Sequence, residues 1–502
     1  MSAPAERPLR SNRLKSGIAV GLASRVVRFL TGLILARAII LRFGPSTWGI
    51  LALSLSVADL VVVVDFAIRE LCVYEAAASR SRAAAQHALD QALLVSTLPA
   101  ALGTLVLVGC AAAGASGFFF AGDYAGRDLA LLFLAAAVAY PFAIAGNVYT
   151  GTLQGFGWIR ELNAAVLATI VLDLAAVLLA LRGGLGIVGI QWARAAVAPV
   201  SLLVVVATVR RLGLPLARPE RPDRAALRGM LGYCVRYNVN RGLGSAVVAS
   251  TIPIAQRFVP ASTLGSFGAA DQWAGKLRKV SEVVWESMFH RLVRCFRGGA
   301  SDEEREDGRL QFLALSLGMS LVVVPAGVAL VLVAPWLFRV WLDAEKARLP
   351  LALLPGLVAA WCLNSTASPS TCAILASNRF RLSARVHAVA LALNVGLTLA
   401  LTRIVGIQGA IAALVATNAF LALVLSLAAC RVTGASWWRW LRSNSIPYGV
   451  AVVVLWWHAR VPTPGVSVLA GALSVAASVA VGLRARSFRS FREILSRPGG
   501  TE

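Results

Sequence analysis

The chain has 502 residues, of which 58% are hydrophobic and only 14% are charged. A soluble chain of this length would carry more charge and would divide into two or more domains. Instead, apolar runs of about 20 residues recur from end to end, each long enough to cross a bilayer as a helix. This composition excludes a soluble enzyme, a secreted disulfide scaffold and a disordered protein. It predicts an all-α polytopic membrane protein.

Segment length and hydropathy predict about 14 transmembrane helices. The predicted spans are residues 16–41, 50–68, 88–113, 129–151, 161–181, 186–209, 230–257, 265–289, 310–334, 349–375, 382–402, 405–429, 445–458 and 464–483. The eighth is the most polar. The thirteenth is short, but it ends in Trp456 and Trp457, which suit a membrane interface.

Charge is distributed unevenly along the chain, with 48 Lys and Arg residues against 24 Asp and Glu residues and a net charge of +24. Loops that remain cytoplasmic retain Lys and Arg. With the N-terminus inside, the inner segments collect roughly 30 of these residues and the outer segments roughly 8. This asymmetry predicts that both termini are cytoplasmic. Such basicity can accompany nucleic-acid binding, but topology accounts for it here, and we expect no nucleic-acid partner.

An internal repeat relates two halves of the chain. Arg42-Phe43-x-Pro45 is echoed by Arg257-Phe258-x-Pro260, and Gly186-Ile187-x-Gly189 by Gly406-Ile407-x-Gly409. The offset stays near 215–221 residues, and repeated six-helix units are a known transporter plan. We therefore predict two six-helix lobes joined by a proline-containing linker and followed by two C-terminal helices. The predicted segments are an N-tail 1–15, an N-lobe 16–209, a cytoplasmic linker 210–229, a C-lobe 230–429, helices 13 and 14 within 430–483, and a basic tail 484–502.

Patterns for catalysis, metals and nucleotides are not found in the sequence. The seven cysteines and four histidines are scattered at spacings that suit neither a disulfide framework nor a metal site. Gly184, Gly186 and Gly189 match a dinucleotide-binding pattern, but they join two apolar helices and lack the acidic residue that the motif requires. We predict that the protein is not an enzyme and uses no cofactor, and that a membrane potential or an ion gradient supplies the energy.

Arginines inside the first span are the most informative residues. A charged side chain costs roughly 2.5–3.5 kcal/mol at the centre of a membrane helix, so it must avoid lipid. Arg25 and Arg28 share one helix face with Gly17, Gly21 and Gly32. This face is typical of the wall of a polar cavity, and we predict that both arginines bind substrate. Arg37, nearer the outer end, is expected to extend to the lipid headgroups.

The seventh span opens the second half and repeats this polar zone. It contains Arg236, Asn240 and Arg241, which we predict to be substrate-binding residues. Arginine binds phosphate through two parallel hydrogen bonds, so two cationic zones would suit a polyanion. The alternative is that these residues only mark the inner end of the helix.

Acidic residues also interrupt the apolar runs. Asp59, Asp65, Asp173 and Asp271 are interpreted as coupling or charge-balancing residues, because an intramembrane carboxylate either neutralises an arginine or binds H⁺ or Na⁺. Asp271 lies in the eighth span. The other charges of that span are equally consistent with a substrate site and with internal ion pairs: Lys276, Arg278, Lys279, Glu282 and Glu286. The polar residues Asn147, Gln154, Asn364 and Asn394 are expected to join helices.

Four short motifs, in order along residues 15–430, resemble one family. They are Leu41-Arg42-Phe43-Gly44-Pro45, Val64-Asp65-Phe66-Ala67-Ile68 with Ala67 where Gly is usual, Gly151-x-Leu153-Gln154-Gly155, and Asn394-Val395-x-Leu397 followed by Gly406-x-x-Gly409-Ala410. The chain resembles the Wzx-like O-antigen and exopolysaccharide repeat-unit flippases of the multidrug/oligosaccharidyl-lipid/polysaccharide exporter superfamily.

The resemblance implies alternating access between two lobes in the bacterial inner membrane. It implies a polyprenyl-diphosphate-linked oligosaccharide as substrate, carried on undecaprenyl diphosphate, with membrane lipids, a polysaccharide polymerase and assembly proteins as further partners. The family's cationic cavity corresponds to the four arginines named above only by zone. The alternatives are a peptidoglycan lipid-precursor flippase, a multidrug or cation antiporter of the same fold, a membrane polymerase or ligase, and a structural assembly partner.

Overall fold

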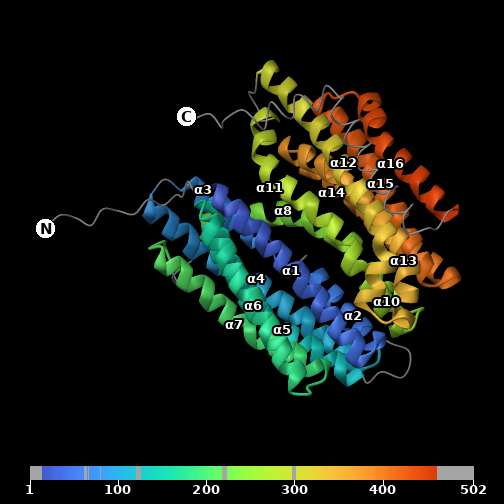
Figure 1. Ribbon diagram of the computed structural model, residues 1–502. Helices are drawn as coiled ribbons and strands as arrows, with labels where there is room; N and C mark the ends of the chain where they lie inside the picture. Colours follow the sequence, from blue (N-terminus) through green and yellow to red (C-terminus); the bar gives the residue numbers. More distant parts are fainter. Residues whose placement is uncertain are drawn as a thin grey trace. The chain divides into compact units, whose positions relative to one another are not determined.

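The computed structural model describes residues 14–61, 65, 67–79, 81–119, 126–217, 223–296 and 301–460. Within these ranges the chain forms helices and no strands, which confirms the all-α prediction (Figure 1). The contacts divide the chain into two compact units, Met1–Arg257 and Phe258–Glu502. The predicted lobe boundaries stay predictions, and the predicted fourteenth span and the basic tail lie outside the described residues.

The first unit contains nine helices in its described part. They are α1 (Leu14–Phe43), α2 (Pro45–Val61), α3 (Ile68–Ala78), α4 (Arg82–Ala115), α5 (Gly126–Gly155), α6 (Ile159–Arg182), α7 (Ile187–Arg211), α8 (Arg224–Ala249) and the short α9 (Thr251–Ala255). α5 packs against α3, α4 and α7, while α1 packs against α2 and α6. α8, which opens the second half of the sequence repeat, packs against α2, α3 and α4 within this unit.

The second unit contains seven described helices. They are α10 (Ala261–Ala274), α11 (Lys276–Phe296), α12 (Asp302–Trp341), α13 (Ala344–Ala376), α14 (Phe380–Val405), α15 (Ile407–Thr433) and α16 (Trp437–Arg460). α13 is central, because α10, α11, α12 and α15 all pack against it. The neighbours of α13 in this unit therefore correspond to those of α5 in the first.

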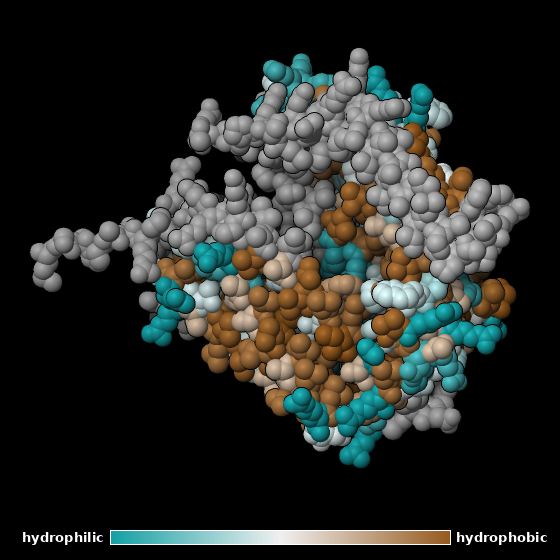
Figure 2. All heavy atoms as spheres, in the orientation of Figure 1, coloured by the Kyte–Doolittle hydropathy of each residue, from teal (hydrophilic) through white to brown (hydrophobic). Residues whose placement is uncertain are grey.

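Eight of the described helices are long and apolar enough to cross a membrane, namely α4 to α7 and α12 to α15. α2 is apolar but shorter. Figure 2 shows apolar side chains gathered over the middle of the first unit's visible helices, with hydrophilic side chains near the helix ends. An apolar belt bounded by polar ends is what a bilayer requires. The protein is a polytopic membrane protein.

The second span is broken rather than continuous, unlike the single helix predicted for residues 50–68. α2 ends at Val61 and α3 begins at Ile68. The Asp65 carboxylate accepts a hydrogen bond from the Ala67 backbone N–H at 2.8 Å, and the Tyr140 hydroxyl of α5 donates to the Val61 carbonyl at 3.4 Å. Side chains thus satisfy backbone groups on both sides of the break, which a low-dielectric environment demands.

The eighth predicted span, residues 265–289, is described as two helices, α10 and α11, that meet at an irregular turn at Gly275. Gly275 keeps a right-handed helical backbone with φ −62° and ψ −15°, and its N–H donates to the Asp271 carbonyl at 2.8 Å, so the helix continues almost without interruption. The Ser365 hydroxyl of α13 donates to the Leu277 carbonyl at 3.2 Å. α2 begins at Pro45 and α10 at Ala261, 216 positions later, within the offset of the sequence repeat. In each unit the central helix therefore supplies a hydrogen bond to the backbone of the corresponding span.

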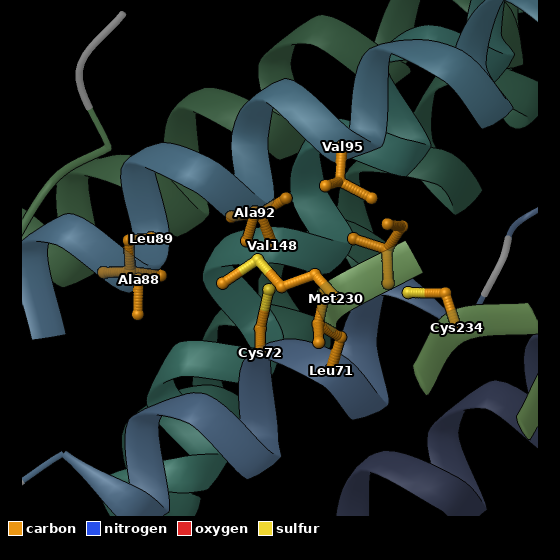
Figure 3. Packing of buried hydrophobic residues seen from close by; sticks show 10 residues of the cluster. Leu71, Cys72, Ala88, Leu89, Ala92, Val95, Val148, Met230 and Cys234 are labelled. Atoms are coloured by element: carbon orange, nitrogen blue, oxygen red, sulfur yellow. The ribbon is translucent and has the colours of Figure 1, made fainter. Parts of the chain in front are cut away.

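Both apolar and polar contacts hold the helices of each unit together. In the first unit, an apolar cluster joins α3, α4, α5 and α8 through side chains that include Cys72, Val148, Met230 and Cys234 (Figure 3). In the second unit, polar contacts connect helices: the Asn364 side-chain amide donates to Asn418 at 2.8 Å. Interhelical hydrogen bonds of this kind hold membrane helices together where lipid provides no hydrophobic drive. The prediction that Asn364 joins helices is confirmed.

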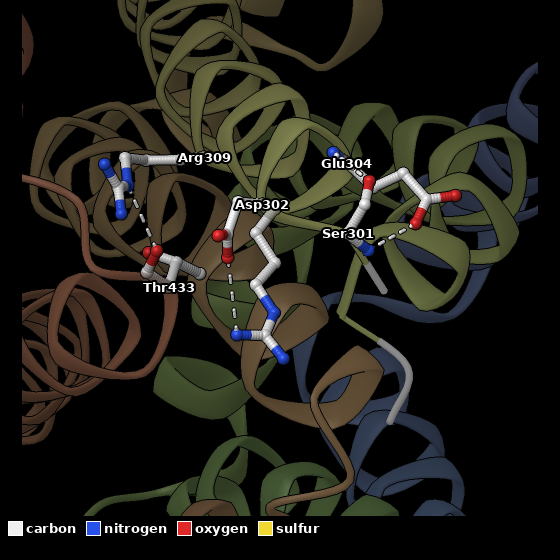
Figure 4. A network of polar contacts seen from close by, with 6 residues as sticks. Ser301, Asp302, Glu304, Arg309 and Thr433 are labelled. Atoms are coloured by element: carbon white, nitrogen blue, oxygen red, sulfur yellow. Dashed lines mark hydrogen bonds and ion pairs between the residues drawn. The ribbon is translucent and has the colours of Figure 1, made fainter. Parts of the chain in front are cut away.

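α12 begins with a polar turn that is well capped. The Ser301 hydroxyl accepts from the Glu304 backbone N–H, and the Glu304 carboxylate accepts from the Ser301 backbone N–H. Two turns on, the Arg309 guanidinium donates to the Thr433 carbonyl at the end of α15 (Figure 4). With 40 residues, α12 is about 60 Å long, roughly twice the hydrocarbon thickness. Its acidic first turn is exposed and extends beyond the apolar part of the helix.

The break after α2 makes a prediction about Ala67, which is fully buried and has a φ of 51°. A β-branched side chain fits this left-handed conformation poorly. We expect Ala67→Val to lower the free energy of unfolding by about 2 kcal/mol, measured by thermal denaturation in detergent. Ala67→Gly is the control and should melt at or near the wild-type temperature. Equal melting temperatures for Ala67→Val and wild type would contradict the conformation assigned to this break.

Candidate substrate site

The hairpin of α1 and α2 places the arginines of α1 beside the break. Both helices rise about 1.5 Å per residue from the turn at Gly44. Arg28 lies 16 residues before Gly44 and Asp59 lies 15 residues after it, so the two occupy nearly the same depth. Arg28 and Asp59 are both exposed. Arg25 is one turn deeper, level with the break itself, and its side chain lies outside the described residues.

α8 runs antiparallel to α2 and α3. The Ser56 hydroxyl donates to the Ala249 carbonyl at 2.7 Å, and Cys72 and Cys234 share one apolar cluster. In both pairs the residue number rises along α2 and α3 as it falls along α8. Counting nine residues from Ser56 and nine back from Ala249 brings Asn240 level with Asp65. The polar zone predicted on α8 is therefore level with the break.

Two polar residues at this level are buried. Asp65 is 5% exposed and Asn240 is 6% exposed. The Asn240 side-chain carbonyl oxygen has no hydrogen-bond partner among the described residues. The side chains of Arg236 and Arg241 lie outside those residues, so their contacts stay predictions. A buried acceptor without a partner is costly, and a protonated or cationic ligand group would satisfy it.

Residue counting along the helices therefore places most of the predicted site residues within a few turns of one depth in the first unit. That level holds Arg25 and Arg28 on α1, Asp59 and Asp65 at the break, and the Arg236–Arg241 segment of α8. Four arginines against two aspartates make the level net cationic. The roles of these residues in binding stay predictions, but their common level, near the middle of α1, is what a phosphate-binding zone inside a membrane protein needs.

Asp173 lies apart from this level of residues and has its own partner. The Arg194 guanidinium of α7 donates to its carboxylate at 3.0 Å, and both side chains are partly exposed. This pair provides charge balance, while a coupling role for Asp173 stays a prediction. The sequence analysis did not identify Arg194. The sequence does carry a signal for the pair, because Asp173 and Arg194 are nearly equidistant from the glycine turn that joins α6 to α7.

Asp271 belongs to the second unit and lies next to the turn at Gly275. The Trp361 indole N–H of α13 donates to its carboxylate at 2.7 Å. The Arg278 guanidinium carbon lies 5.8 Å from the centre of the Trp361 ring. The side chains of Glu282 and Glu286 lie outside the described residues. Trp361 was not singled out from the sequence, since a tryptophan in an apolar run gives no signal of its own.

The sequence analysis also did not identify Arg69, an arginine of α3 that lies just after the break between α2 and α3. The Arg69 guanidinium of α3 donates to the Gln154 side-chain carbonyl of α5 at 2.9 Å. This bond confirms that Gln154 joins helices. In the described part of the chain, no group of three or more His, Cys, Asp or Glu residues could hold a metal ion.

Comparisons with known proteins bear on the fold. No protein-family model and no curated protein match the chain. Among solved structures, the lipid II flippase MurJ in an inward closed conformation matches with a TM-score of 0.69 and 10% identity over 95% of this chain and 100% of that one. An inward-facing multidrug resistance MATE family transporter of the MOP superfamily matches with a TM-score of 0.65 and 16% identity over 83% of this chain and 98% of that one.

A third match is a MOP superfamily transporter from Pyrococcus furiosus, with a TM-score of 0.52 and 18% identity over 87% of this chain and 99% of that one. Identities this low show a shared fold. The chain has the fold of MOP superfamily transporters. These three neighbours are a flippase and two transporters, not enzymes. Membership of the Wzx-like family within this superfamily stays a prediction.

The Asp173–Arg194 pair makes a testable distinction between coupling and charge balance. Asp173→Asn leaves Arg194 without its carboxylate and should reduce the amount of folded protein. The double variant Asp173→Asn/Arg194→Gln should restore it, because removing both charges removes the need for pairing. The measurement is the yield of monodisperse protein after gel filtration, together with transport in cells. A double variant that folds normally but does not transport would contradict the charge-balance role.

Proposed function

We propose that the protein is a flippase for undecaprenyl-diphosphate-linked oligosaccharide repeat units of O-antigen or exopolysaccharide. It moves them from the cytoplasmic to the periplasmic leaflet of the bacterial inner membrane by alternating access. The observation that supports this proposal most directly is the level of arginines and aspartates at the break between α2 and α3. The likeness to MOP superfamily transporters supports the transport class.

The chemistry of such a substrate explains why arginine is needed. A diphosphate cannot cross hydrocarbon unaided, because burying unpaired charge costs too much. Guanidinium groups on α1 and α8 would hold the phosphates through paired hydrogen bonds, while the polyprenyl tail remains in the bilayer. Lysine would provide charge without the planar fork. Nearly all cations of the chain are arginine, with Lys only at positions 15, 276, 279 and 346.

Transport against a gradient needs an energy source. We propose the membrane potential or an ion gradient, because the sequence has no nucleotide-binding motif. Asp59 and Asp65 near the break between α2 and α3, and Asp271 beside the turn at Gly275, are the proposed coupling residues. Interrupted helices serve this purpose in transporters, since their ends and freed backbone groups bind charged ligands.

Two alternatives have specific support. A peptidoglycan lipid-precursor flippase would use the same headgroup chemistry, and a solved lipid II flippase shares the fold. A multidrug or cation antiporter shares the fold as well. Cationic drugs favour an acidic cavity, however, and arginines at mid-helix on α1 and α8 disfavour them. We therefore rank the lipid-linked oligosaccharide first, with both termini cytoplasmic and a polysaccharide polymerase and assembly proteins as partners.

Deletion of the gene followed by lipid extraction tests this function. We expect lipid-linked repeat units to accumulate in the inner leaflet, with peptidoglycan precursors unchanged. Accumulation of peptidoglycan precursors instead would favour the first alternative, and drug sensitivity without any lipid accumulation would favour the second.

Individual arginines test the binding zone. Arg28→Ala and Arg25→Ala should each reduce export of repeat units at least tenfold with normal protein levels, since losing a charge-assisted pair costs about 1.5–3 kcal/mol. Arg37→Ala is the matched control from the same helix, and it should export normally. Export is measured from surface polysaccharide and protein level by immunoblot. Normal export by both variants would show that the cationic zone does not hold the substrate.

A further inference from the structure

One indole contacts two opposite charges on either side of the turn at Gly275. Trp361 is 3% exposed, and its N–H donates to the Asp271 carboxylate at 2.7 Å. The centre of its ring lies 5.8 Å from the Arg278 guanidinium carbon. Asp271 belongs to α10 and Arg278 to α11, on opposite sides of Gly275. The ring therefore contacts an acid before the turn and a base after it.

The two contacts of the ring depend on each other. A hydrogen bond to an ionised carboxylate is stronger than one to a neutral acid, and it polarises its donor. Electron density pushed into the indole makes the ring face more negative, which strengthens its attraction for a guanidinium. Protonation of Asp271 weakens the hydrogen bond, and the hold of the ring on Arg278 weakens with it.

The surroundings make Asp271 the controlling acid of this group. It is the only acidic residue of α10, and the bases nearest to it in the sequence are Lys276, Arg278 and Lys279. The acids of α11, Glu282 and Glu286, have side chains outside the described residues. α13 and α15 pack against α10 and carry no charged residue over 349–376 and 407–430. The neighbouring thiol of Cys362 points elsewhere, since it donates to the Val323 carbonyl of α12 at 3.5 Å.

We propose that Trp361 is a positioning residue that links protonation of Asp271 to binding of an anionic diphosphate by Arg278. This inference rests on the proposed function. With Asp271 ionised, Arg278 is held over the ring. With Asp271 protonated, Arg278 is released to bind phosphate. Because such coupling is reciprocal, bound diphosphate favours the protonated acid in turn, and proton and substrate travel together.

The experiment measures binding of farnesyl diphosphate to the full-length protein in nanodiscs from pH 5.5 to 8.0. Titration of the ligand's own phosphates affects every variant alike, so the comparison is between variants. Between pH 5.5 and 8.0, the affinity of the wild type should fall at least fivefold more than the affinity of Asp271→Asn. Fivefold is a typical coupling magnitude. Trp361→Phe keeps an aromatic ring but loses the N–H donor, and it should follow the pH profile of Asp271→Asn. Trp336→Phe, at a residue that is 66% exposed, is the matched control and should follow the wild type.

Each result bears on a distinct claim. If Trp361→Phe keeps the wild-type pH profile, Trp361 only packs and the inference is wrong. If wild type and Asp271→Asn share one profile, Asp271 does not control binding, and the inference is wrong while the proposed function stands. If the wild type binds no diphosphate at any pH, the proposed function fails and this inference fails with it. Asp271→Asn changes charge but hardly shape, so it provides a test even where Trp361→Phe folds poorly.

Discussion

The cost of holding charge inside a membrane constrains the whole molecule. An arginine or aspartate at mid-bilayer is destabilising unless it finds a partner, water or a ligand. Arg28 lies near the centre of the 30-residue α1, where no helix end is within reach. A chain that retains such a residue must shape the surrounding helices to accommodate it, and the break between α2 and α3 lies about one turn from its depth. The charge on α1 and the interrupted backbone between α2 and α3 are therefore linked features of the structure.

The break in the first unit and the irregular turn in the second are both supported by the central helix of their unit. In the first unit a tyrosine hydroxyl from α5 binds the last carbonyl of α2, and a carboxylate holds the first N–H beyond the gap. In the second unit α13 contributes a serine hydroxyl to the backbone and a tryptophan N–H to a carboxylate. Interrupted helices supported from outside are able to shift between two arrangements more cheaply than continuous ones. That property suits a transporter that opens alternately to either side.

Sequence reasoning found the fold class, because hydrophobic runs of membrane length admit few alternatives. It also found the charged residues that the structure later brings to one level, since an arginine in an apolar run is conspicuous. It missed the break between α2 and α3 and the irregular turn at Gly275. Nothing in Val64–Ile68 lowers hydropathy enough to end a span, and the left-handed conformation of Ala67 depends on the Asp65 side chain and on burial. Trp361 and Arg69 were missed because their importance lies in contacts with distant helices, and only tertiary packing reveals those.

The central claim is that the positive charge at position 28, and not the shape of the side chain, serves transport. The most direct measurement uses Arg28→Cys in a background without the native cysteines, in proteoliposomes that report flipping of a diphosphate-linked oligosaccharide. Position 28 is exposed, so a thiol there is open to modification. Flipping should be lost in the unmodified variant, return after a reagent that attaches a permanent positive charge, and stay lost after a neutral reagent of equal size. Equal recovery with both reagents would contradict the account.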